Sequence, residues 1–423
     1  MESLMNIKKQ KYTFFILLSI TLIMSFTFSG CQMIPPVPLE AKWTVMVYLA
    51  AGNDLETVGI QDINEMEMVG STNDVNIVVQ MDRIPFSVLS SFGLGHLDDS
   101  SNNDWTGTRR YYITQDMNPN IINSRLLMDL GEKNMGDPET LKDFSQWTIQ
   151  NYPAERYMLV LWNHGGGFRS PDVSRDICWD WNFGLDSKIT MPQLEESMAF
   201  ISGQLGRKID IVGMDACYMG MTEVAYQVKD YAQIMVASEA SVPGDGWQYD
   251  CVLQSLVTST SQTSKQFAAE IVDCYYNQYS GTGSNITLSA IDLSQIGNLA
   301  DQISGLAQAI INDSSVPKNK YHDARNSSQY YTGVGFEYID LKHLVNQLPS
   351  YTANSSVLNY ADRINQSMEL GNVIIENTHI GNSVKNSYGL TIYWPYYIYN
   401  DYYDNTNFAQ DKLWDEMLYH LGY

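Results

Sequence analysis

The sequence predicts an α/β protein built on a mostly parallel sheet that is flanked by helices. Two nearly continuous apolar runs, "WTVMVYLAA" (43–51) and "DVNIVVQMD" (74–82), are typical of strands buried on both faces. Between them, residues 53–70 have helical spacing and an acidic first turn that suits the helix dipole. The order strand, helix, strand, with short turns, indicates a parallel sheet.

The same alternation continues to about residue 250. Residues 83–136 are rich in loop-forming residues, with a possible hairpin around 106–116. A helix is expected in 189–205, where Thr190 and Gln193 can form a capping box. The other expected elements are a helix at 138–151, strands at 156–167 and 208–217, a helix at 219–232 and a strand at 233–240.

The second half of the chain has a mixed pattern and favours a smaller C-terminal subdomain beside the core. Its expected helices are 262–278, 294–311, 352–369 and 410–421, and its expected strands are 286–293, 372–379 and 387–395. The predicted division is a signal peptide (1–30), a linker (31–42), a catalytic core (43–255) and a C-terminal part with a sheet extension and helices (256–423).

The N-terminus has the pattern of a secretion signal. Three lysines precede the apolar stretch 12–28, and "FSGC" ends it at Cys31. This end resembles a bacterial lipobox, although Phe28 stands where leucine is usual, and the resemblance implies cleavage before Cys31 and lipid on its thiol. A plain signal peptide and an uncleaved anchor are the alternatives. Each places the rest of the chain outside the cytoplasm, and lipid on Cys31 would anchor it to a membrane.

Composition narrows the classes of partner. The formal net charge of −23 makes a nucleic-acid partner improbable, because phosphates would be repelled. Four cysteines remain after Cys31, without a CxxC spacing, so a zinc site is not expected. An exported protein can form disulfides, and one or more of these cysteines can be free thiols.

Two expected strand ends carry reactive side chains. His164 and three glycines follow one strand, and Cys217 follows the next strand, 53 residues later. Sites in parallel sheets gather beyond the carboxyl ends of strands, so the two side chains can face each other across a cleft. An imidazole can take the thiol proton and later protonate a leaving amine. The amides of Gly165 and Cys217 can serve as an oxyanion hole. A structural histidine and an inert buried cysteine remain the alternative.

The blocks "WNHGGGF" (162–168) and "DACYMG" (215–220) resemble the histidine and cysteine blocks of the clostripain family of cysteine peptidases, in the caspase–gingipain–legumain superfamily. The stretches 43–56, 237–247 and 388–395 also resemble that family. The resemblance implies a caspase-like fold, His164 as general base and acid, and Cys217 as nucleophile.

The resemblance also implies a specificity. Asp215 and Asp245 match acidic positions of a pocket for a substrate Arg or Lys, and a carboxylate pairs well with either cation. Both aspartates have a turn-forming role as the alternative interpretation. Tyr218 stands where the family usually has Leu. Some members cut themselves between the two blocks, which makes Arg175, or less favourably Arg169, a possible cleavage site; an uncut loop is equally possible. Some members respond to calcium, but the sequence shows no ligand set, and no cofactor is expected.

Three functions are therefore open. The first is a lipid-anchored cysteine endopeptidase that acts on peptides or proteins after Arg or Lys. The second is a non-catalytic surface lipoprotein that binds peptide or glycan, with the aromatic-rich stretch 388–405 as a binding face. The third is a peptidase that cleaves after Asn or Asp; Asp215 and Asp245 argue against an acidic substrate residue.

Overall fold

A nine-stranded sheet organises the structure, which is a computed structural model that describes residues 40–168, 176–331 and 337–423. Cys31, Arg169 and Arg175 lie outside the described residues. The strand order is β10-β8-β7-β6-β5-β1-β2-β3-β4. The strands are β1 (Ala41–Ala51), β2 (Val75–Arg83), β3 (Gly107–Tyr112), β4 (Arg125–Gly131), β5 (Ala154–Trp162), β6 (Ile209–Asp215), β7 (Ala232–Ala237), β8 (Ile286–Asp292) and β10 (Ile374–Ile380).

The centre of this sheet is parallel and its two edges are antiparallel. All neighbouring pairs from β7 through β6, β5 and β1 to β2 are parallel. The pairs β2–β3, β3–β4, β7–β8 and β8–β10 are antiparallel. The parallel centre follows from the helical crossovers that the sequence predicts, because a helix returns the chain to the same end of the sheet.

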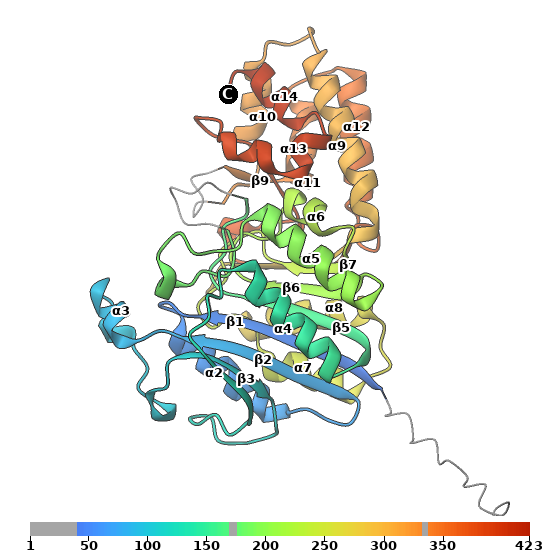
Figure 1. Cartoon of the computed structure of the whole chain (residues 1–423). Helices are drawn as coiled ribbons and strands as arrows, with labels where there is room; N and C mark the ends of the chain where they lie inside the picture. The colour runs from blue at the N-terminus through green and yellow to red at the C-terminus, as the bar shows by residue number, and fades with distance from the viewer. Residues whose placement is uncertain (1–39, 169–175, 332–336) are drawn as a thin grey trace, which may run out of the picture. The chain divides into compact units, whose positions relative to one another are not determined.

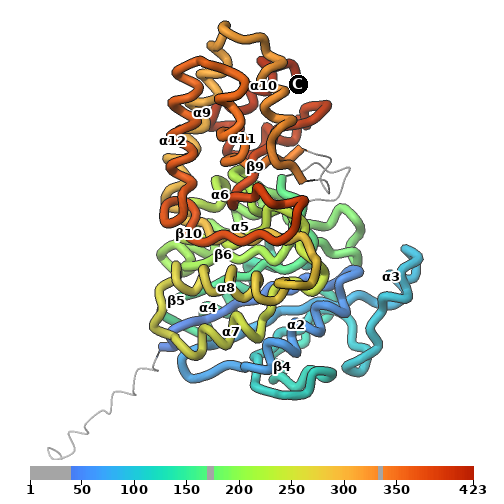
Figure 2. The backbone as a smooth tube through the Cα atoms, turned by 180° about the vertical axis from the view of Figure 1, so that it is seen from behind, coloured from blue at the N-terminus to red at the C-terminus, as the bar shows by residue number. Residues whose placement is uncertain are grey.

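Helices cover both faces of the sheet. Helices α4, α5 and α6 lie on the face toward the viewer in Figure 1, and α2, α7 and α8 lie on the other face in Figure 2. Their bounds are α2 (Glu56–Val69), α4 (Pro138–Asn151), α5 (Met191–Leu205), α6 (Thr222–Val228), α7 (Tyr249–Thr258) and α8 (Ser264–Tyr279). The expected capping box of Thr190 and Gln193 is present at the start of α5.

Each face has its own hydrophobic core. Along β1, Met46, Tyr48 and Ala50 belong to the cluster under α4, α5 and α6. The intervening Val45, Val47 and Leu49 belong to the cluster under α2, α7 and α8. A strand sends alternate side chains to opposite faces, so a strand buried on both faces must be apolar at every position. The apolar run in 43–51 is therefore continuous because β1 is buried on both faces.

The remaining helices gather beyond the β8–β10 edge of the sheet (Figure 1). With them lies a two-stranded sheet of β9 (Tyr338–Asp340) and β11 (Thr391–Tyr393). These helices are α9 (Ile296–Ile311), α10 (Asn319–Asn326), α11 (Leu341–Gln347), α12 (Ser355–Ser367), α13 (Asn407–Asp411) and α14 (Trp414–Leu421); a short α3 (Phe86–Ser91) projects from the opposite side of the sheet.

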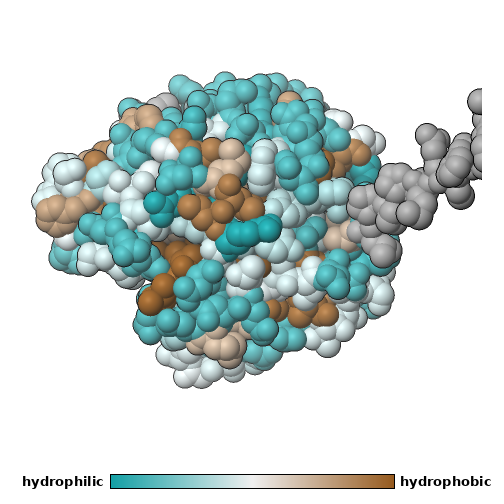
Figure 3. Space-filling model, turned by 60° about the horizontal axis from the view of Figure 1, so that its bottom comes forward, coloured by the Kyte–Doolittle hydropathy of each residue, from teal (hydrophilic) through white to brown (hydrophobic). Residues whose placement is uncertain are grey.

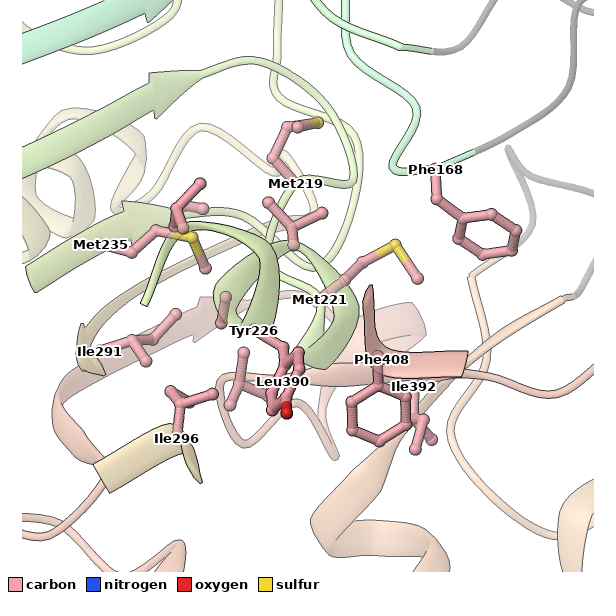
Figure 4. Packing of buried hydrophobic residues seen from close by; sticks show 14 of the residues in the cluster. Phe168, Met219, Met221, Tyr226, Met235, Ile291, Ile296, Leu390, Ile392 and Phe408 are labelled. Carbon is pink, nitrogen blue, oxygen red and sulfur yellow. The ribbon is translucent and has the colours of Figure 1, made fainter. Parts of the chain in front are cut away.

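The C-terminal part packs directly on the turn that follows β6. Figure 4 shows Met219 and Met221 of this turn in one apolar cluster with Leu390, Ile392 and Phe408. The amide of Thr391 donates to the carbonyl of Gly220 over 2.9 Å. The second half of the chain therefore supports the end of β6.

Several element predictions were wrong in extent. The strand expected at 156–167 ends at Trp162, and the helix expected at 410–421 is divided between α13 and α14. The helix expected at 219–232 begins only at Thr222, because the amide of Gly220 donates to the carbonyl of Ser238 and keeps this segment extended. The strand expected at 387–395 is limited to β11, because the amides of Tyr388 and Gly389 donate to the carboxylates of Asp340 and Glu239 instead of a neighbouring strand. The hairpin expected at 106–116 contains β3 alone, and its partner β4 comes 12 residues after β3 ends.

The face shown in Figure 3 is mainly hydrophilic, with small separate hydrophobic patches. None of the helices in the described ranges is both long and apolar enough to cross a membrane.

Candidate active site

The two reactive strand ends lie side by side. Strands β5 and β6 are parallel neighbours, and Trp162 pairs with Asp215 at their carboxyl ends. The amide of Asn163 donates to the carbonyl of Asp215 over 3.2 Å, which extends the pairing by one residue. His164 therefore leaves β5 at the level where Ala216 and Cys217 leave β6.

A cavity of about 120 Å³ opens between these ends. Its lining includes His164, Cys217 and Asp215, so the structure brings three of the expected site residues together. The other lining residues are Leu55, Trp162, Asn163, Ala216, Val242, Pro243, Gly244 and Gly246. A larger cavity of about 540 Å³ contains Arg156, Lys208 and Lys265 near the amino ends of the strands, without a cysteine or histidine in its lining.

The Cys217 thiol rests against the backbone of Val242. Its Sγ accepts a hydrogen bond from the Val242 amide over 3.2 Å and lies 3.8 Å from the Val242 carbonyl oxygen. Burial raises the pKa of the Cys217 thiol, and the Val242 amide opposes that effect only in part. The resting thiol is therefore protonated, and needs a base before it can attack a carbonyl.

The backbone around Cys217 allows the turn that carries Gly165 to come into direct contact with it. Tyr218 has a φ of +59°, a conformation that costs a non-glycine residue about 1–3 kcal/mol. Its amide is fixed by the carbonyl of Ala240 over 2.9 Å. A Cβ on Gly165 would lie 2.5 Å from the Cys217 carbonyl oxygen, so only glycine permits this contact. Within the described residues, the amides of Gly165 and Cys217 donate to no backbone carbonyl of another residue.

Asp215 lies at the buried base of the cavity. It is 4% exposed, and its Oδ2 accepts from the Trp247 amide and the Tyr249 hydroxyl, each over 3.1 Å. Its Oδ1 has no hydrogen-bond partner among the residues that the structure describes. Burial raises the pKa of Asp215 to about 7 despite these two donors. Asp245 is exposed in the adjacent turn and is not among the lining residues.

Two acidic residues of α2 beyond its first turn, to which the sequence assigned no role, lie close to this base. The Trp162 indole donates to Asp62 over 2.6 Å, and the Tyr249 amide donates to Glu65 over 3.0 Å. Burial raises the pKa of Asp62 well above its usual value and that of Glu65 to about 7. Asp215 contributes to both shifts, so the three carboxyl groups repel one another when ionised.

The residue that sequence reasoning missed next to His164 is Asp54. Its Oδ1 lies 2.7 Å from His164 Nε2, and both side chains are partly exposed, at 28% and 30%. The stretch 43–56 was noted for its resemblance, yet no role was given to Asp54. Its place just beyond the end of β1, next to β5 in the sheet, was the available signal.

One group of acidic side chains in the described ranges is close enough to hold a metal ion. Asp82, Glu132 and Asp180 each offer an oxygen within 4.8 Å of the others. The chain's own donors already bind these groups: Thr108 and Asn182 contact Asp82, Asn182 contacts Glu132, and the Met135 amide contacts Asp180.

Two of the cysteines form a disulfide and two are free. Cys251 in α7 is bonded to Cys274 in α8, a pairing that the sequence left open. Cys178 is free but buried, and burial raises the pKa of its thiol far above the usual value. Among the cysteines of the described ranges, Cys217 is therefore the free thiol that lines a cavity.

The family model that matches residues 47–420 is described as the clostripain family, and it covers most of the chain. The chain belongs to the clostripain family of cysteine peptidases. Clostripain from Hathewaya histolytica is 34% identical over 231 residues, which are 51% of this chain and 42% of that protein. The chain thus matches less than half the length of this curated relative.

Solved structures of other C11 proteases share the fold. A secreted C11 cysteine protease from Bacteroides thetaiotaomicron, in complex with an irreversible peptide inhibitor, has a TM-score of 0.67 at 20% identity, covering 89% of this chain and 100% of the other. An inactive zymogen C11 protease from Parabacteroides distasonis has a TM-score of 0.64 at 18% identity, covering 89% of this chain and 99% of the other. The predicted fold class, a mostly parallel sheet flanked by helices, is confirmed.

Proposed function

We propose that this protein is a cysteine endopeptidase that cleaves after Arg or Lys, with Cys217 as nucleophile and His164 as general base and acid. The observation that carries the proposal is the shared cavity: a thiol and an imidazole line its walls, and a buried carboxylate, Asp215, lies at its base. A clostripain-family sequence supports the same chemistry. It also argues against a non-catalytic lipoprotein that only binds peptide or glycan.

The reaction begins when a substrate side chain with a positive charge enters the cavity. The Oδ1 atom of Asp215 is the acceptor left for this cation, because its Oδ2 already accepts two hydrogen bonds. The Cys217 thiol then turns from Val242 toward His164, which removes its proton. The thiolate sulfur attacks the scissile carbonyl carbon and forms a tetrahedral intermediate.

The amides of Gly165 and Cys217 are the donors for the oxyanion of this intermediate. As the C–N bond breaks, the imidazolium of His164 gives its proton to the leaving amine. Water, deprotonated by His164, then attacks the thioester carbonyl and releases the acid product and the thiol. Asp245 stands at the exposed rim, where it would attract the cation before it enters.

A panel of fluorogenic peptides with Arg, Lys, Asn or Asp before the scissile bond tests this function. We expect the purified full chain, in mild detergent, to cleave the Arg and Lys peptides, and Cys217→Ala to cleave none. Cleavage after Asn or Asp would keep the nucleophile and reject the pocket assignment. Absence of all cleavage, with or without calcium, would reject the peptidase.

The anchor and maturation steps are parts of the same proposal. Lipid attached to Cys31 would hold the enzyme on a membrane outside the cytoplasm, so Cys31→Ser should move the protein from the membrane fraction to the soluble fraction.

Specificity for arginine would also allow the chain to cut itself after Arg175 or Arg169. Wild-type protein should then yield two fragments on a denaturing gel, whereas Cys217→Ala should stay intact; an intact wild-type chain would favour the uncut loop.

A further inference from the structure

The Asp54 side chain has a single described contact of hydrogen-bonding or ionic type, and that contact is His164. Its Oδ1 lies 2.7 Å from His164 Nε2. Asp54 does not cap α2, because the residue at the N-cap position is Leu55, whose amide is bound by the Asn53 side chain. A role in forming the turn therefore does not explain the Asp54 carboxylate.

The segment that carries Asp54 is fixed from both sides. The Asn53 side chain donates to the carbonyl of Ala50 over 3.0 Å and to that of Trp179 over 2.9 Å. The Asn163 side chain, directly before His164, donates to the same two carbonyl oxygens. The ends of β1 and β5 are thus bound to common acceptors, which sets the distance between Asp54 and His164.

The imidazole ring is also held by aromatic neighbours. The Trp179 ring lies 5.7 Å from it, centre to centre. The Trp181 ring lies at 6.5 Å, with only 12° between the two ring planes. These contacts restrict the tilt of the ring. The contact with the Asp54 carboxylate then orients the ring so that Nε2 faces Asp54.

We propose that Asp54 is a positioning residue that accepts the Nε2 proton of His164 and so makes Nδ1 the basic nitrogen of the reaction. A neutral imidazole has one N–H and one lone pair, and the carboxylate can accept but not donate. With the proton on Nε2, Nδ1 is free to take the proton of Cys217 and later to give it to the leaving amine. Asp54 then stabilises the imidazolium that forms in between.

The inference rests on the proposed dyad, so its test must separate the two. The variants are Asp54→Asn, Asp54→Glu and His164→Ala, with Asp74→Asn as a control at an exposed acidic residue at the opposite end of the sheet, before β2 begins. An asparagine can donate to Nε2, which favours the tautomer with its proton on Nδ1. That tautomer cannot accept the thiol proton.

We expect Asp54→Asn to lower kcat on an arginine peptide by about 10²-fold or more, with KM within a factor of about two. Asp54→Glu should recover part of kcat, because it restores an acceptor, and Asp74→Asn should match wild type. The second measurement is the rate of alkylation of Cys217 by iodoacetamide as a function of pH, with Cys217→Ala as blank. In Asp54→Asn the reactive thiolate should appear only at higher pH than in wild type.

The outcomes distinguish the two proposals. If Asp54→Asn and wild type share kcat and the alkylation profile while His164→Ala alters both, the role of Asp54 is overturned and the dyad stands. A reduced kcat with an unchanged alkylation profile and a lowered melting temperature would mean a structural role and also overturn the inference. If His164→Ala leaves the alkylation profile unchanged, the dyad itself fails, and the role of Asp54 fails with it.

Discussion

At the scale of single residues, the proposed role of Asp215 in substrate specificity implies a dependence on pH. Burial raises its pKa to about 7, so the carboxyl group is mainly neutral below pH 7 and mainly charged above it. A guanidinium keeps its positive charge throughout this range. The attraction between the pocket and a cationic side chain should therefore grow as pH rises through 7.

We predict that benzamidine, a small cation that cannot be cleaved, binds more tightly at pH 8 than at pH 6. The expected gain is about 10-fold, because most of the Asp215 population changes from neutral to charged over this interval. Isothermal titration calorimetry at both pH values measures it, and Asp215→Asn should bind weakly with no such gain. Equal affinity of the wild-type protein at both pH values would contradict a titrating carboxyl group at the base of the pocket.

A second prediction at the scale of single residues concerns the effect of a side chain at Gly165 on kcat. A Cβ there would lie 2.5 Å from the carbonyl oxygen and 3.1 Å from the amide nitrogen of Cys217. Gly165→Ala should therefore displace Cys217, the proposed nucleophile, and lower kcat by about 10²-fold, since small misplacements of reacting groups have such effects. The measurement is kcat on an arginine peptide.

Gly203 is the matched control for this substitution. It lies within α5, and no atom stands within 4 Å of an added Cβ. Gly203→Ala should leave kcat unchanged and raise the free energy of unfolding by about 0.5–1 kcal/mol, because alanine is the better helix former. A Gly165→Ala variant as active as wild type would show that the two strand ends are not in contact during the reaction.

At the scale of elements, the C-terminal part contacts the turn that carries His164 and the turn that carries Cys217. The Tyr338 hydroxyl in β9 donates to the Gly166 carbonyl over 2.6 Å, beside His164. The Thr391 amide in β11 donates to Gly220, beyond Cys217. The small sheet of β9 and β11 thus fixes the position of the histidine turn relative to the cysteine turn.

The disulfide joins the two helices that follow the pocket turn. Cys251 in α7 and Cys274 in α8 are 23 residues apart, and a bond across a loop of this length stabilises a fold by about 3 kcal/mol. We predict that Cys251→Ser with Cys274→Ser lowers the free energy of unfolding in urea by about that amount. A reducing agent should lower the free energy of unfolding of the wild type by the same amount and leave that of the double variant unchanged. If the wild type and the double variant are equally stable without a reducing agent, Cys251 and Cys274 are not bonded to each other.

The sequence was sufficient to predict the neighbours β5 and β6, because an apolar run, one helix and another apolar run allow few topologies. It predicted His164, Cys217 and Asp215 as neighbours for the same reason. It missed β9, since three residues carry no periodic pattern, and it missed the role of Asp54, since nothing local indicates a contact 110 residues along the chain. The disulfide connectivity could not be predicted either, because any two of the four cysteines could pair.

At the scale of the whole molecule, buried carboxyl groups set the response to pH. Burial raises the pKa values of Asp215, Glu223 and Asp340 to about 7, whereas such groups titrate near 4 in an unfolded chain. Between these values the folded state binds more protons, so its stability falls as pH rises from about 4 to about 7. The net charge of −23 at pH 7 acts in the same direction through self-repulsion.

We predict that the melting temperature is higher at pH 5.5 than at pH 8, by about 5 °C. Added sodium chloride should raise it at pH 8 more than at pH 5.5, because salt screens the repulsion. Differential scanning calorimetry of the full chain at both pH values provides the measurement. A higher melting temperature at pH 8 would contradict the raised pKa values of these buried carboxyl groups.

Covalent labelling with an arginyl chloromethyl ketone, followed by mass spectrometry of the peptides, tests most directly whether Cys217 is the nucleophile of a pocket that binds arginine. A cavity with Asp215 at its base and Cys217 in its wall predicts one adduct, on Cys217, that depends on His164. An aspartyl chloromethyl ketone should react far more slowly, and Asp215→Asn should remove the difference. An adduct on the buried Cys178 would contradict Cys217 as the nucleophile. Equal rates for the two reagents would contradict a pocket that binds arginine through Asp215.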